Sequence, residues 1–185
     1  MTYPIKAFRR FSRNFLRDEH GTVMGEGLVM MPMLVWGYLS MFVFWDAYRT
    51  MNAVQKASYV VSDMISRELS VTPVYLTGLD NVMEYLLGTT EDSSMRVTSI
   101  VWDAADNRFE VLWSRNVSGG MTALTTGSLQ TLAPRLPAMS DGDTVVLVET
   151  SVLYSTAMNV GIDDVAFSEF IVTRPRFANR IELRS

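Results

Sequence analysis

The sequence contains no cysteine and only one histidine, His20. Without cysteine the chain can form neither a disulfide framework nor a thiolate metal site, and thiol catalysis is excluded. Because His20 lies near the start of the chain, the long segment that follows has no imidazole for a Ser-His pair or a multi-histidine metal site. We therefore predict no cofactor, no metal site and no enzymatic activity.

Charge is missing from a second place, the 19 residues between Gly27 and Trp45. Fifteen of these residues are large and apolar or aromatic, and Asp46 ends the run. A helix of this length is about 28 Å long, close to the roughly 30 Å hydrocarbon core of a bilayer. We predict a membrane-spanning helix over residues 22–45, since a buried helix that is apolar all round would require a larger domain.

Basic residues are concentrated at the start of the chain. Residues 1–20 contain five basic and two acidic residues, whereas the segment from Asp46 onward contains 11 basic and 17 acidic ones. Positive charge before the span predicts a cytoplasmic N-terminus, with the domain over residues 46–185 on the far side of the membrane. The acidic balance of that domain offers no basic patch for nucleic acid, which we do not expect as a partner.

The segment beyond the span has the pattern of an α+β domain. Apolar residues at helical spacing predict that the membrane helix continues to about residue 69. Alternating apolar residues further on predict an antiparallel sheet of about four strands with helices on one side. The predicted elements are a helix over 79–87 capped by Thr77, a hairpin over 95–114, a short helix over 128–133, and strands over 144–154 and 165–174.

Two acidic pairs in this domain have simpler explanations than a site. Asp141 and Asp143 flank Gly142, and a turn explains this spacing better than cation binding does. Asp163 and Asp164 are most simply solvated loop residues.

One acidic residue remains unexplained by these patterns. Glu26 lies at the threshold of the apolar run, in the stretch "GTVMGEGLVMM" that begins at Gly21. An ionised carboxylate in the middle of a bilayer costs roughly 2.5–3.5 kcal/mol, so a carboxylate at such a position commonly has a function.

A basic leader ending in Gly21, a glutamate five residues later and an apolar helix together resemble the processing site of type IV prepilins. The fuller pattern "FLRDEHGTVMGEGLVMMPML" is similar to the TadE/TadF (TadE/TadG-like) proteins, the pilin-like components of tight-adherence pili. The resemblance is good over about the first 70 residues. It implies that the membrane is a bacterial inner membrane and that residues 46–185 form a periplasmic domain. It also implies that a prepilin peptidase removes residues 1–21 and that Thr22 becomes the mature N-terminus.

The resemblance also implies a role for Glu26, which would neutralise the α-amine of an adjacent subunit during assembly. The expected function is a minor pilin or pseudopilin acting in pilus biogenesis and adhesion, with other pilin-like subunits as partners. Alternatively, the leader is retained and Glu26 lies at headgroup level, as in any protein with one span. The chain would then be an uncleaved adaptor in the inner membrane.

Overall fold

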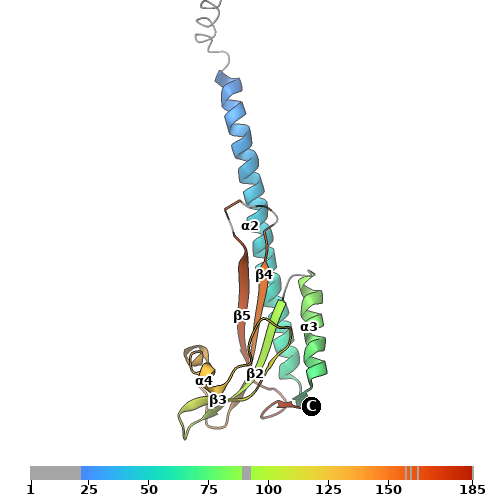
Figure 1. The fold of residues 1–185 in the computed structure, drawn as a ribbon, viewed down its shortest axis with the longest axis vertical. Helices are drawn as coiled ribbons and strands as arrows, with labels where there is room; N and C mark the ends of the chain where they lie inside the picture. Colours follow the sequence, from blue (N-terminus) through green and yellow to red (C-terminus); the bar gives the residue numbers. More distant parts are fainter. Residues whose placement is uncertain (1–21, 89–92, 157, 159, 162, 185) are drawn as a thin grey trace, which may run out of the picture. The chain divides into compact units, whose positions relative to one another are not determined.

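A computed structural model of the chain describes residues 22–88, 93–156, 158, 160–161 and 163–184. The chain divides into two compact units, Met1–Phe44 and Trp45–Ser185. The expected α+β fold is confirmed: a long apolar helix near the N-terminus packs on a four-stranded antiparallel sheet (Figure 1).

The long helix, α2, extends from Thr22 to Ser66 and continues across Pro32. Proline has no amide hydrogen, so the carbonyl of Leu28 receives no helical hydrogen bond from position 32. Within the second unit the buried face of α2 carries small and β-branched side chains at helical spacing, namely Val54, Ala57, Val61 and Ile65. Ser58 on the same face shares a buried hydrogen bond of 2.7 Å with the hydroxyl of Thr150.

The long helix ends three residues earlier than residue 69, where the sequence predicted its end. The next helix, α3, extends from Pro73 to Leu87 and also differs from the prediction. Its N-cap is Thr72, whose hydroxyl accepts a hydrogen bond from the amide of Tyr75, and not Thr77. Proline at the first helical position lacks only an amide that no helical carbonyl would bind, so it starts α3 six residues before the predicted helix. Gly88 ends α3 in the left-handed conformation, with φ of 64°.

The sheet has the strand order β3-β2-β4-β5, and all of its neighbouring strands are antiparallel. The predicted hairpin, the long strand after it and the final strand are confirmed as β2 (Ser93–Asp103), β3 (Arg108–Asn116), β4 (Thr144–Tyr154) and β5 (Val165–Thr173). Asn107 closes the hairpin with φ of 50°, a backbone conformation that asparagine tolerates better than most residues.

Side chains alternate between two cores on opposite faces of the sheet. On one face Val146 and Val148 of β4 pack with residues of α2 and α3, which lie side by side there (Figure 1). On the other face Val145 and Leu147 pack with Leu129 of α4 (Thr126–Leu129). The sequence predicted helices on one side only. This was wrong, because α4 and the 3-10 turn η2 (Ala133–Arg135) cover the second face.

A two-stranded parallel sheet, absent from the sequence-based expectation, ties the end of the chain to the α2–α3 connection. It pairs β1 (Ser70–Val71) with β6 (Glu182–Leu183). The indole nitrogen of Trp113 donates a 2.8 Å hydrogen bond to the carbonyl of Ile181, just before β6. The C-terminal segment is thus held against β3 and the first core.

Candidate functional site

The first unit exposes an apolar helix surface. Among residues 22–44, fourteen large apolar or aromatic side chains are exposed, and even the least exposed of these, Val35, is 53% exposed. Soluble monomers rarely leave so much contiguous apolar surface in water, which marks a surface for a membrane or another protein. This helix is long and apolar enough to cross a membrane.

The three predicted site residues lie at the start of this helix. Thr22 is the first residue of α2, and Gly21 lies outside the described residues. Glu26 follows one turn later and is exposed. Its carboxylate forms no hydrogen bond or ion pair with any residue from the described part of the chain. The Glu26 carboxylate is therefore available to a group outside the described part of the chain.

The helix dipole gives little reason for a carboxylate at this position. The favourable interaction of an anion with a helix N-terminus falls off within the first turn, and the first turn of α2 contains no acidic residue. Residues 22–25 are uncharged, as are residues 27–45. Glu26 is thus an isolated charge within an exposed apolar helix, and a partner charge would lower its cost.

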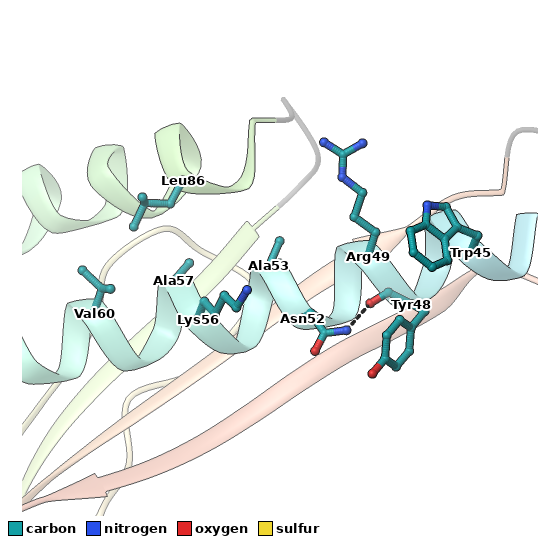
Figure 2. A pocket seen from close by; sticks show the side chains of 9 residues that line it. All are labelled: Trp45, Tyr48, Arg49, Asn52, Ala53, Lys56, Ala57, Val60 and Leu86. Atoms are coloured by element: carbon teal, nitrogen blue, oxygen red, sulfur yellow. Dashed lines mark hydrogen bonds between the residues drawn. The ribbon is translucent and has the colours of Figure 1, made fainter. Parts of the chain in front are cut away.

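The second unit contains an open groove between α2 and α3, with a volume of about 530 Å³ (Figure 2). We call it the α2–α3 groove. Its lining comes from α2 between Trp45 and Val60, and from Leu86 of α3, which projects toward α2 (Figure 2). Trp45 and Tyr48 are exposed at one end, and the small side chains of Ala53 and Ala57 line the middle.

Two cationic side chains line the α2–α3 groove, Arg49 and Lys56. They are seven residues apart, so they lie on the same face of α2. Neither forms an ion pair with the residues that the structure describes. The groove therefore offers an apolar floor and two cations that lack a carboxylate within the described parts of the chain.

The two acidic pairs noted in the sequence lie in loops. The segment Asp141–Gly142–Asp143 is a turn, with Gly142 at φ of 74°. Asp141 accepts a hydrogen bond of 3.0 Å from the amide of Ala104, and Asp143 accepts one of 3.0 Å from the amide of Ser140. Asp163 and Asp164 are exposed loop residues, as expected.

The structure also contains a cluster of three acidic residues that the sequence did not predict. Carboxylate oxygens of Asp103, Asp106 and Glu110 lie within 4.8 Å of one another at the β2–β3 hairpin. The guanidinium of Arg108 lies 2.8 Å from the Asp106 carboxylate and 2.7 Å from that of Glu110. These carboxylates raise the pKa of Arg108. The arginine already neutralises much of their charge, so the group is explained as a hairpin ion-pair network.

One buried acid lies on α3. Asp80 is 8% exposed, and its Oδ1 oxygen has no hydrogen-bond partner within the described structure. Burial, together with the nearby charge of Glu84, raises the pKa of Asp80, while a hydrogen bond with Ser118 opposes the shift. The folded state therefore disfavours the charged form of this carboxyl.

The sequence indicated Glu26 as a candidate site residue but did not predict the α2–α3 groove. The groove depends on Leu86, which is 26 residues from Val60 and reaches it only because α3 folds back along α2. The sequence contained a weak indication of this groove. Arg49 and Lys56 share a helical face with Trp45, so that face combines an apolar side chain with two charged ones.

Comparison with family models, with curated proteins and with solved structures finds no match to this chain. Its function therefore has to be inferred from its own residues and geometry.

Proposed function

We propose that the chain is a structural and assembly protein, a minor pilin or pseudopilin-like subunit of a tight-adherence type pilus. It is inserted in a bacterial inner membrane through residues 22–45, with the leader in the cytoplasm and residues 46–185 in the periplasm. A prepilin peptidase cleaves between Gly21 and Thr22. The processed subunit then enters, primes or caps a pilus that serves surface adhesion.

Glu26 is the observation that carries this proposal. It is exposed, has no partner among the described residues, and lies one turn into an exposed apolar helix. Cleavage after Gly21 would create a cationic α-amine at Thr22. In an assembled bundle of such helices, the amine of one subunit and the Glu26 carboxylate of its neighbour compensate each other in a low-dielectric environment. An acid that is costly for a single chain in lipid thereby becomes favourable for assembly.

The test is the mature N-terminus of the protein from its native host, determined by mass spectrometry of separate membrane and shed-filament fractions. We expect a chain that begins at Thr22 and is found in both fractions. Gly21→Leu should block cleavage, because a side chain there obstructs the approach of the backbone to the protease. Gly25→Ala is the matched control, since a Cβ at Gly25 would meet no atom within 4 Å.

A leader retained in cells that contain the peptidase would contradict this proposal and favour the uncleaved adaptor. Topology is tested separately with a reporter fused after Ser185. The five basic residues of the leader should hold it in the cytoplasm, so the reporter should show periplasmic activity. Cytoplasmic reporter activity would contradict both readings.

A further inference from the structure

The α2–α3 groove has the dimensions and lining of a seat for a helix. It follows α2 from Trp45 to Val60, about four helical turns or roughly 22 Å. Ala53 and Ala57 form its floor, where small side chains permit the close approach of another backbone. Leu86, which is 43% exposed, forms the wall on the α3 side. An amphipathic helix placed in such a groove buries its apolar face.

The charges of the groove specify what kind of helix fits. The chain from Asp46 onward is acidic, and six of its arginines are already in ion pairs: Arg67, Arg96, Arg108, Arg174, Arg176 and Arg180. Five basic residues have no such pair in the described structure: Arg49 and Lys56 are the two that line the groove, and Arg115, Arg135 and Arg184 lie outside it. The spacing of seven residues between Arg49 and Lys56 matches two carboxylates seven residues apart on a helix lying along α2.

We propose that the α2–α3 groove binds an acidic amphipathic helix that belongs to a different subunit of the same membrane assembly. The apolar face of that helix rests on Ala53, Ala57 and Leu86, and its carboxylates pair with Arg49 and Lys56. The inference rests on the proposed function in one respect, since that function places other subunits with extramembrane helices beside this one.

Charge excludes a symmetric contact in which the grooves of two copies face each other. The lining contains no acidic residue, so two grooves placed face to face would bring Arg49 and Lys56 against their own counterparts. Like charges juxtaposed at an interface oppose association. The partner must therefore present a surface of different composition.

Anionic lipid accounts for only one of the two cations. Trp45 is the last residue of the apolar run, and Arg49 lies one turn beyond it. Lys56 lies eleven residues beyond Trp45, or about 16 Å along the helix. The headgroup layer on one side of a bilayer is only about 5–8 Å thick, which reaches Arg49 but falls short of Lys56. An acidic helix explains both cations.

The inference is tested by photocrosslinking of the full chain in its native membrane. In one variant a benzoylphenylalanine residue replaces Leu86 in the groove. In the control variant it replaces Val74, which is on the same helix, is 82% exposed and lies outside the groove lining. Adducts are located by mass spectrometry of the crosslinked peptides. We expect the Leu86 probe to capture a helix with carboxylates about seven residues apart, in a different membrane-anchored subunit, and the Val74 probe not to capture it.

Charge reversal then distinguishes specific docking from proximity. Lys56→Glu should reduce the Leu86 adduct about tenfold, because it places like charges together. Arg115→Glu is the matched control, since Arg115 is exposed, has no ion pair within the described residues and does not line the groove. It should leave the adduct unchanged. Replacement of the captured carboxylate by lysine should restore the adduct in the Lys56→Glu background.

The inference is overturned by an adduct with lipid alone, by an adduct within the same chain or with a second copy, or by one that Lys56→Glu leaves unchanged. These outcomes are separate from failure of the proposed function. A chain correctly processed at Thr22 that gives no such adduct contradicts the groove, whereas an unprocessed chain that gives it contradicts only the pilin-like function.

Discussion

The hydroxyl of Tyr154 donates a hydrogen bond of 2.9 Å to the carboxylate of Asp46, across 108 residues of sequence. Asp46 is the residue that ends the apolar run, and Tyr154 is the last residue of β4. The ring of Tyr154 is buried and lies 5.7 Å from the ring of Phe167, centroid to centroid. The contact fastens the first turn of α2 in the second unit to the far end of the sheet.

Tyr154→Phe removes this hydrogen bond but keeps the ring. A hydrogen bond to a charged group typically contributes about 1.5–3 kcal/mol. Because the Asp46 carboxylate is partly exposed to water, we expect a smaller loss of about 1 kcal/mol in the free energy of unfolding. For a domain of this size that corresponds to a decrease of roughly 2–4 °C in Tm. The measurement is thermal unfolding of the full chain in detergent. Tyr59→Phe is the control, since Tyr59 is exposed and its hydroxyl bonds to no described residue; an equal effect in both variants would rule out the specific contact.

The same pair predicts a dependence on alkaline pH. Burial of the phenol, with the Asp46 carboxylate beside it, raises the pKa of Tyr154 from 10.0 to about 12. The folded state therefore keeps its proton at a pH where the unfolded chain has lost it. The resulting stability is fully present below pH 10 and is lost as the pH rises to about 12. The difference in Tm between wild type and Tyr154→Phe should shrink over this window, and a constant difference would contradict the assignment.

The start of α3 gives a test in which sequence and structure disagree. Thr72→Ala removes the hydroxyl that caps the amide of Tyr75, and should cost about 1 kcal/mol of stability. Thr77, the cap predicted from the sequence, instead donates its hydroxyl to the carbonyl of Pro73 inside the helix. Thr77→Ala should change stability by less than about 0.5 kcal/mol, since alanine is the better helix former. Thermal unfolding of both variants shows which threonine caps the helix. A larger loss of stability from Thr77→Ala than from Thr72→Ala would favour the helix start predicted from the sequence.

The reason for that disagreement is local. Thr77 with Asp80 three residues on has the pattern of a capping box, but the same pattern occurs inside helices when a stronger start signal precedes it. Here Thr72 followed by Pro73 is that signal. By contrast, β4 was predicted with its observed ends. A run of eleven residues rich in valine and threonine follows the turn at Gly142, and such a run favours a strand over a helix.

Features that join distant segments could not be predicted in the same way. The pair of β1 and β6 is two residues long on each side and connects Val71 with Leu183, so it leaves no periodicity in the sequence. A short helix was predicted over 128–133, and α4 is observed two residues earlier, at Thr126–Leu129. The second core was missed because α4 has only four residues and one buried side chain, Leu129, which leaves no pattern to show which face of the sheet it covers. Glu26 could be named as a candidate from the sequence because its signal is local: one charge at a fixed distance from a glycine, beside an uncharged run.

Asp80 provides a prediction about stability at neutral pH. Its pKa is raised above 3.8, so the protonated form is favoured in the folded state. That contribution is present below pH 3.8 and is lost as the pH rises through the folded-state pKa, which leaves a buried charge at neutral pH. Asp80→Asn should therefore stabilise the protein on the order of 1 kcal/mol at pH 8, and the gain should disappear as the pH falls to 3.8.

The control for Asp80 is Glu84→Gln, which removes the exposed charge beside it. This variant should give a smaller gain in Tm than Asp80→Asn, because burial is the larger cause of the shift. Loss of stability in Asp80→Asn at pH 8 would mean that the carboxylate makes a favourable interaction there.

Glu26→Gln should separate insertion into the membrane from assembly. The lone chain loses no ion pair with the described residues, and removal of a charge lowers the cost of the helix in lipid, so insertion and topology should persist. Loss of one member of a buried pair typically costs about 3–5 kcal/mol, because the other charge is left without a partner. At roughly 1.4 kcal/mol per tenfold, even half of that cost reduces subunit association tenfold or more.

The variant should accumulate in the inner membrane while its amount in shed filaments falls sharply, as measured by quantitative blotting of both fractions. Glu84→Gln, which removes an exposed carboxylate on α3, should assemble normally. Filaments of Glu26→Gln at wild-type level would show that this carboxylate lies at the headgroups and has no partner in another subunit.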